Sequence, residues 1–192
     1  DQERYQGLTD AEVAEEQQAD RQVDAAVEAC RGKILYLGSA GGIMSKATLP
    51  DMLREAAKSR PGLVVMGFGW DSEETAEFTP DWFGVLPHRP GAMARVYGAS
   101  LAVLGATMDV QREYGMVNNR VFEVLAAGAS LITEHFTELE GLLGPRACYV
   151  KSKGGVTSCI TELELRAKME HARWRRSICN DKELDTLAKL AE

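Results

Sequence analysis

The chain has 192 residues, a length that favours one domain, or one domain with an appendage, and that can bury a sizeable core. Hydrophobic residues make up 45% of the chain, which excludes an intrinsically disordered protein. The longest uncharged stretch, residues 96–108, is too short to cross a bilayer, and the formal net charge of −7 argues against a nucleic-acid partner.

The first residues of the chain and its cysteines indicate how the protein is processed and in which cellular compartment it is expected. The first residues, DQERYQGLTD, are acidic and polar, unlike a signal peptide, and because Met is absent we expect a processed or excised piece of a longer protein. The cysteines Cys30, Cys148, Cys159 and Cys179 are too sparse for a disulfide framework and form no Cys-x-x-Cys pair. We therefore expect reduced thiols, no metal site and a cytoplasmic location.

Acidic charge is concentrated in the first 32 residues, whose nine acids and three bases carry −6 of the net −7. Thr9 and Glu12 have the spacing of a capping box, and apolar residues follow at helical spacing from Val23. This pattern predicts a helix over 10–30 that ends at Gly32.

The composition changes at Gly32, which predicts an acidic N-terminal helix or linker at 1–32 and a Rossmann-like lobe at 33–192. Only the second half of the helix has an apolar face. We expect either a solvated linker packed on the lobe by that half, or a surface for a partner or a missing domain.

Short apolar runs alternate with helical patterns through the rest of the chain. Strands are predicted at 33–38, 63–68, 82–86, 100–104, 130–133 and 147–150. Helices are predicted at 48–59, 90–98, 118–127, 160–178 and 181–191. This alternation predicts an α/β fold with a Rossmann-like, doubly wound and mostly parallel sheet, whose ligands lie at the carboxyl ends of the strands.

Small residues follow the first predicted strand, in the run Gly38-Ser39-Ala40-Gly41-Gly42. Such a loop lets a ligand approach the backbone, and free amides in it can hold an anion, with Lys46 a further candidate phosphate contact. The spacing is neither a dinucleotide fingerprint nor a P-loop, so a plain tight turn stays open.

The second predicted strand ends in Gly67-Phe68-Gly69-Trp70-Asp71, where alternate glycines indicate a close backbone approach. Asp71 is a candidate to hold the ribose of NAD. A nicotinamide-dependent α/β enzyme is therefore kept as an alternative function, although the glycine fingerprint of that class is absent.

The stretch 114–133, YGMVNNRVFEVLAAGASLIT, carries the clearest site pattern. Asn118 or Asn119 opens a helix whose first-turn amides favour an anion, and Arg120 and Glu123 lie on one helix face. Arg120 suits a phosphate, and the Glu123 carboxylate suits paired ribose hydroxyls. The alternative is a surface Arg–Glu pair with ordinary capping.

The run NNRVFEVLAAGASLIT resembles the R-x-F-E-x-L-A-x-G signature of the spore maturation protein CgeB-like glycosyltransferases, which belong to the group 1 glycosyltransferases of GT-B fold. LYLGS, VVMGFGW and GVLPHRPGAMARVYGASLAVLGAT resemble further pieces of that family in the expected order. The resemblance covers roughly residues 33–180.

This resemblance implies a lobe that binds a nucleotide-diphosphate sugar, with UDP-sugar the commonest donor, and needs neither a cofactor nor a bound metal. It implies that Glu123 holds the donor ribose, with Arg120 beside it, and that Gly38 and Ser39 lie next to the diphosphate. Because GT-B enzymes have two lobes and this chain has room for one, it also implies an acceptor lobe or partner chain elsewhere.

Other candidate side chains are weaker. His88, in a Pro-flanked loop, is either a sugar or phosphate contact or an ordinary loop histidine, and Asn119 is either a cap or a ligand. Glu134 and His135 follow a strand end near the expected donor sugar. Further candidates for a surface role are Arg173, Trp174, Arg175 and Arg176.

The leading expectation is a glycosyltransferase donor lobe, with catalytic residues, acceptor and stereochemistry unassigned. A non-catalytic binding or assembly module on the same fold, docking through the acidic helix, is the first alternative. A nicotinamide-dependent enzyme is the second.

Overall fold

A six-stranded, wholly parallel sheet forms the centre of the molecule. The computed structural model describes residues 5–42, 47–78 and 81–178, with side chains as far as Met169. The strands are β1 (Ile34–Leu37), β2 (Leu63–Met66), β3 (Asp81–Gly84), β4 (Ala102–Gly105), β5 (Leu131–Glu134) and β6 (Ala147–Val150). Their order is β3-β2-β1-β4-β5-β6, and each neighbouring pair is parallel, which confirms the predicted doubly wound α/β fold.

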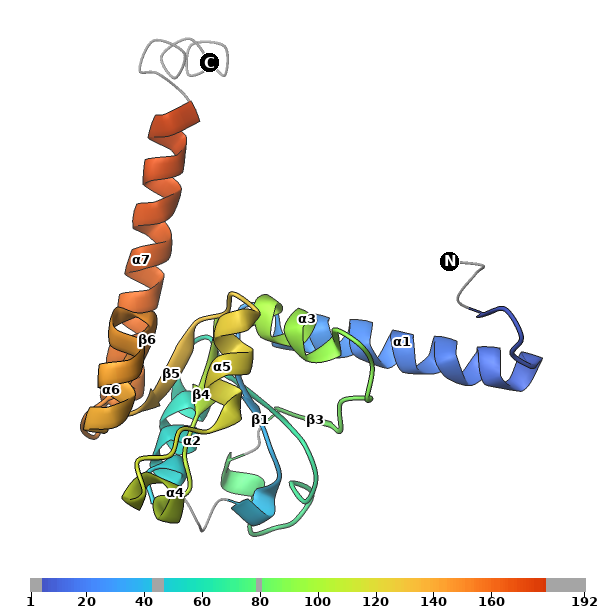
Figure 1. Cartoon of the computed structure of the whole chain (residues 1–192), viewed down its shortest axis with the longest axis horizontal. Helices are drawn as coiled ribbons and strands as arrows, with labels where there is room; N and C mark the ends of the chain where they lie inside the picture. Colours follow the sequence, from blue (N-terminus) through green and yellow to red (C-terminus); the bar gives the residue numbers. More distant parts are fainter. Residues whose placement is uncertain (1–4, 43–46, 79–80, 179–192) are drawn as a thin grey trace.

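Helices connect these strands and cover both faces of the sheet (Figure 1). They are α1 (Asp10–Cys30), α2 (Leu49–Lys58), α3 (Ala92–Ala99), α4 (Asp109–Glu113), α5 (Asn119–Ala126), α6 (Thr137–Leu143) and α7 (Gly155–Ile178). Short 3-10 turns lie at Ala40–Gly42, Ala76–Phe78 and Gly144–Arg146. The predictions did not include α4 and α6, and the helix predicted at 181–191 falls outside the described residues.

The central strands are buried between two helical layers, whereas the edge strand β3 is partly exposed. All four residues of β2, β4 and β5 are buried, as expected for a parallel sheet covered on both faces. Side chains alternate across β1, so Ile34 and Tyr36 join the core under α2 and α7, while Leu35 joins the core under α1, α3, α5 and α6.

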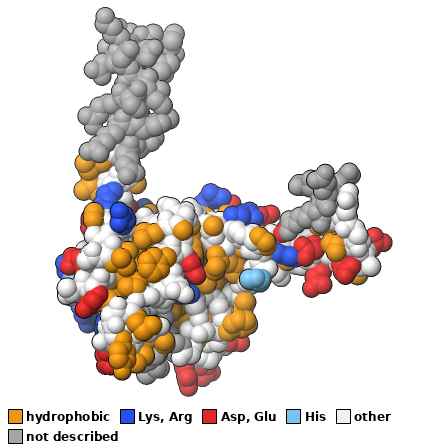
Figure 2. Space-filling view, in the orientation of Figure 1, with side chains coloured by type: hydrophobic (Ala, Val, Ile, Leu, Met, Phe, Trp, Pro, Cys, Tyr) orange, Lys and Arg blue, Asp and Glu red, His pale blue; other side chains and the backbone are white. Residues whose placement is uncertain are grey.

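The first helix packs on the lobe through its second half only. Its predicted capping box is present, because the Glu12 amide donates to Thr9 Oγ1 (3.4 Å) and the Thr9 amide donates to Glu12 Oε2 (2.7 Å). The buried residues of α1 are Val23, Ala26 and Cys30, and α3 is the helix that it packs against. Figure 2 shows acidic side chains along the rest of α1. The domain boundary at residue 32 stays a prediction.

The last described helix, α7, leaves the sheet and extends away from it (Figure 1). It begins five residues before the predicted start, because Val156 is buried against the core under α2. Leu165 and Met169 are 57% and 51% exposed. None of the helices in the described ranges is long and apolar enough to span a membrane. The candidate residues 173–176 lie outside the described side chains.

Candidate functional site

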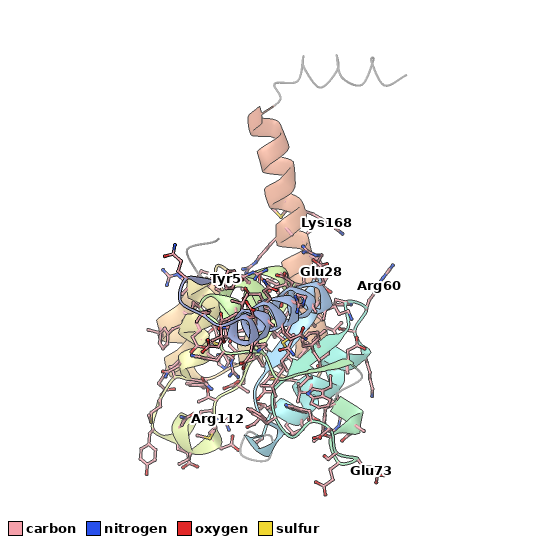
Figure 3. The ribbon with its side chains drawn as sticks, turned by 90° about the vertical axis from the view of Figure 1, so that its right-hand side faces the viewer. Tyr5, Glu28, Arg60, Glu73, Arg112 and Lys168 are labelled. Carbon is pink, nitrogen blue, oxygen red and sulfur yellow. The ribbon has the colours of Figure 1, made fainter. Side chains whose placement is uncertain are left out.

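The connections that follow the neighbouring strands β1 and β4 run over opposite faces of the sheet. The chain passes from β1 to α2 on one face and from β4 to α5 on the other, so the topological switch point lies between β1 and β4. In Figure 3, Glu73 after β2 and Arg112 after β4 lie at the lower end of the molecule, whereas Glu28 and Arg60, which precede β1 and β2, lie nearer the upper end. The lower end therefore carries the carboxyl ends of the strands, where ligands bind in such folds.

The small-residue loop after β1 is bonded to the end of β2. The Gly38 amide donates to the Met66 carbonyl (2.8 Å), and the Ala40 amide donates to the Phe68 carbonyl (2.9 Å). These two amides are therefore not free, and the expectation that successive free amides of this loop hold an anion is wrong for Gly38 and Ala40.

The loops after β1 and β2 touch at Gly67 and Gly38. Gly67 has φ 137°, and a Cβ built on it would lie 2.2 Å from the Gly38 carbonyl oxygen. This position therefore requires glycine both for its backbone conformation and for the close approach. The predicted approach at the alternate glycines is confirmed at Gly67, where the partner is the protein's own backbone.

A pocket of about 570 Å³ lies over these loops, between α3 and α5. Four of the predicted site residues line it together, namely Gly38, Ser39, His88 and Glu123. Apolar side chains make up most of the remaining wall, including Leu37, Met66, Phe68, Val85, Leu86, Met93 and Ala126. A mostly apolar cavity with a few convergent polar groups is typical of a small-molecule site.

The polar side chains at the mouth of the pocket are free to meet a ligand. Ser39, His88 and Glu123 are exposed, and within the described part of the chain the side chains of Ser39 and His88 make no hydrogen bond to other residues. Figure 2 shows that hydrophobic side chains gather over the neighbouring α4 and α5, where Tyr114 and Phe122 are 78% and 49% exposed. No cluster of three or more metal-ligating side chains occurs in the ranges that the structure describes.

Arg120 lies behind the pocket and does not line it. Asn118, and not Asn119, caps α5, because Asn118 Oδ1 accepts from the Arg120 amide (2.9 Å). The Arg120 guanidinium carbon lies 6.0 Å from the centre of the Tyr36 ring, and its Nε is buried without a hydrogen-bond partner. Arg120 is thus half-buried and outside the pocket wall, and Asn119 is exposed and also outside it.

Arg120 and Glu123 form no ion pair with each other among the residues that can be described, so the alternative of a surface Arg–Glu pair is wrong. Glu123 lines the pocket, and Arg120 reaches the buried tyrosines beneath it. Of the two side chains, only Glu123 lines the cavity.

Two further polar residues of the pocket wall were not singled out from the sequence. Tyr97, on α3, is 1% exposed and lines the pocket. Arg89 also lines the pocket and pairs with Glu16 of α1 at 2.6 Å. The only sequence signals were the position of Tyr97 in the family-like helix and that of Arg89 beside His88, because a Tyr on an apolar helix face is usually a core residue.

Glu134 and His135 do not line the pocket, and their side chains contact other residues near the ends of the strands. The Glu134 side chain is 1% exposed and accepts a hydrogen bond from the Thr107 amide (2.6 Å) at the end of β4. His135 Nε2 lies 2.7 Å from Glu140 Oε2. Asp71 is exposed and does not line the pocket, and Lys46 falls outside the described residues.

Comparison with known protein families shows which family the chain belongs to. A family model described as glycosyl transferase-like matches residues 48–186, which is well over half of the chain. A search among curated proteins gave no match. The matched region contains every described strand from β2 to β6 and all residues of the pocket wall except Leu37, Gly38 and Ser39. The chain therefore belongs to the glycosyl transferase-like family.

Proposed function

We propose that the chain binds the nucleotide diphosphate of a sugar donor and is the donor lobe of a GT-B glycosyltransferase similar to the CgeB-like proteins. The observation that carries this proposal is the pocket at the carboxyl ends of β1 and β2. Four separate segments bring Ser39, His88, Tyr97 and Glu123 to it, and the side chains of Ser39 and His88 make no hydrogen bond to other residues within the described ranges.

Each polar group has a role that its chemistry supports. The Glu123 carboxylate accepts hydrogen bonds from ribose hydroxyls, since an ionised carboxylate only accepts. Ser39 and His88 lie on the rim, where a diphosphate or the donor sugar can meet them. The half-buried Arg120 and Arg89 supply positive charge close to the cavity.

The proposed reaction breaks the bond between the anomeric carbon of the sugar and the diphosphate oxygen. The anomeric carbon bonds to an acceptor oxygen, the acceptor loses a proton, and the bond electrons leave with the nucleoside diphosphate. The added negative charge on the leaving group is stabilised by fixed positive charges and donors, which is where Arg89 and Arg120 contribute. This scheme uses no bound metal or cofactor.

A second lobe is part of the proposal. The acceptor and its activating base are assigned to an acceptor lobe or partner chain that packs near the strand carboxyl ends. The exposed apolar residues Val110, Tyr114 and Met116, at and after α4, support a contact with another protein surface on this side.

The test is a thermal shift against UDP, GDP, ADP, CMP and NAD, repeated with Glu123→Ala. A ligand at about 100 times its dissociation constant adds roughly 2.7 kcal/mol to the stability of the protein that binds it. We expect one nucleoside diphosphate to raise the melting temperature of the wild type and to lose this effect in E123A. The matched control is Glu164→Ala, which removes an exposed carboxylate from α7 outside the pocket.

The outcomes separate the candidate functions. Stabilisation by NAD alone would favour a nicotinamide-dependent enzyme and overturn the proposal. A diphosphate response that survives in E123A would remove Glu123 from the site. We expect little or no sugar transfer from this chain alone, so turnover by the pure protein would contradict the assignment of the acceptor lobe to another part.

A further inference from the structure

An ion pair joins the acidic helix α1 to the wall of the pocket. Arg89 lines the pocket, and its Nη1 lies 2.6 Å from Oε1 of Glu16 on α1. Arg89 Nη2 also donates to the main-chain carbonyl of Glu16 (3.4 Å). The two side chains are only 19% and 30% exposed, so water screens this pair less than a pair on the open surface.

Glu16 lies on the face of α1 that is turned towards the lobe. It precedes Val23 by seven residues, and side chains seven apart lie on the same side of a helix. Val23, Ala26 and Cys30 are buried along this face, where α3 lies against α1 (Figure 1). The inward face of α1 is thus apolar beside α3 and carries a carboxylate where the helix passes Arg89.

The segment 85–91, which carries Arg89, has little main-chain support of its own. Residues 85–89 lie between β3 and α3 and form no helix, strand or turn. Pro87 and Pro90 have no amide hydrogen to donate. Most of the segment nevertheless lines the pocket, including His88. Its position therefore depends on side-chain anchors, and the bond from Arg89 to Glu16 is one of them.

A second cavity, of about 430 Å³, lies between this segment and α1. Val23 of α1 lines it on one side, whereas Arg89 and Ala92 line both this cavity and the pocket. Arg89 thus stands in the partition between the two. Because there is open space behind the partition, the segment has room to move away from the pocket when Arg89 is released.

We infer that Glu16 of α1 is a positioning residue of the pocket, which holds the 85–91 segment in the pocket wall through Arg89 and so raises the affinity of the lobe for its ligand. The effect on affinity rests on the proposed nucleotide-binding function. The inference makes the acidic helix a working part of the site, in addition to a linker or a docking surface.

The first measurement is amide hydrogen exchange of the free protein over the 85–91 segment. We expect Glu16→Ala to speed exchange there by roughly three- to tenfold, the equivalent of one net hydrogen bond, while the buried strand β4 keeps its exchange rate. The matched control is Glu15→Ala, which removes an exposed carboxylate from the same helix and should leave the segment as in the wild type. In an Arg89→Ala background, E16A should add nothing, because the partner of Glu16 is gone.

The second measurement is the dissociation constant of ADP, GDP, CDP and UDP with the wild type, E16A and E15A. For each nucleotide that binds, we expect the constant to rise by roughly three- to tenfold in E16A and to stay unchanged in E15A. The direction of this change is informative. Loss of a negative charge alone would strengthen the binding of an anion, whereas loss of a positioned wall weakens it.

The outcomes separate this inference from the proposed function. Unchanged exchange of the segment in E16A, a further increase when E16A is added to R89A, or nucleotide binding by E16A as tight as that of the wild type overturns the inference and leaves the proposed function standing. Faster exchange in β4 as well, or failure of E16A to fold, makes Glu16 a residue of general stability and also overturns it. If the wild type binds none of the nucleotides, the proposed function fails, and the exchange rates still decide whether Glu16 holds the segment.

Discussion

The indole nitrogen of Trp70 donates a hydrogen bond of 2.6 Å to the carbonyl oxygen of Gly38. Trp70 is 2% exposed, and its ring meets Tyr36 edge-on at 5.7 Å. Trp70, which follows β2, thereby fixes the position of Gly38. Gly38 is the first residue after β1 and forms part of the pocket wall. The floor of the site is thus positioned by a buried tryptophan that does not itself line the cavity.

Replacing Trp70 with Phe keeps an aromatic ring but removes this donor. We expect the free energy of unfolding to fall by about 1–3 kcal/mol, because the Gly38 carbonyl loses its partner. Urea unfolding measures the change. Trp82→Phe is the control, since Trp82 is 41% exposed and makes a longer bond of 3.2 Å to the Gly67 carbonyl. Equal losses in W70F and W82F would contradict the role given to Trp70.

Gly67→Ala should disturb the floor more than an ordinary glycine substitution does. The new Cβ would lie 2.2 Å from the Gly38 carbonyl oxygen, and the φ of 137° is strained for alanine by about 1–3 kcal/mol. Gly62→Ala separates these effects, because Gly62 also has positive φ (77°) but has open space around its Cβ position. Urea unfolding should show a clearly larger loss in G67A, and a loss no larger than that of G62A would argue against the steric clash.

Glu134→Ala should destabilise the protein, because Glu134 accepts hydrogen bonds from the Thr107 amide (2.6 Å) and from Thr133 Oγ1 (3.2 Å). Glu134 Oε1 accepts from the buried Thr107 amide, and without it that donor is unsatisfied at a cost of about 1–3 kcal/mol. Glu134→Gln keeps an acceptor oxygen and should lose less. Denaturant unfolding of both variants tests this, and a glutamine variant as unstable as the alanine variant would show that the negative charge, and not the acceptor, matters.

Stability should fall at alkaline pH through Cys30. Burial raises the pKa of the Cys30 thiol from 9.0 to about 11, and the residue is 0% exposed. The folded state therefore holds the proton more tightly than the unfolded state. This difference contributes to the free energy of unfolding in full below pH 9. The contribution is lost as the pH rises towards 11, by up to about 1.4 kcal/mol per pH unit.

The comparison protein is Cys30→Ala, which lacks this titration. Tyr36 and Tyr97, whose pKa values burial also raises, titrate in both proteins, so their effect cancels in the difference. Unfolding free energies measured by urea at pH 8 and pH 10.5 should converge for wild type and C30A. Parallel losses in the two proteins would rule out the Cys30 contribution.

Hydrophobic periodicity was sufficient to predict the six strands and the long helices, because each buries a regular face. It could not predict α4 and α6, since helices of five and seven residues give too few repeats to recognise. It also placed the start of α7 too late, because Gly155 and Val156 are poor helix formers and only packing against the core makes them helical.

The site was predictable as a set of residues but not as an arrangement. The glycine loop, the Pro-flanked loop and the Arg–Glu spacing pointed to Gly38, His88 and Glu123, which line one pocket at the edge of the sheet that the strand-end rule indicates. Patterns carry no distances, so they could not show that Glu123 lines the pocket while Arg120 lies outside its wall. Tyr97 was missed because its position on an apolar helix face indicates only that the ring is buried.

The floor of the pocket is held by main-chain groups and two tryptophans, whereas its polar rim takes no part in holding the fold. Ser39 and His88 have no structural hydrogen bond to lose among the described residues. Exchanging these rim residues should alter ligand preference at little cost in folding free energy. A lobe constructed in this way can acquire new ligand specificities by single substitutions while its scaffold remains unchanged.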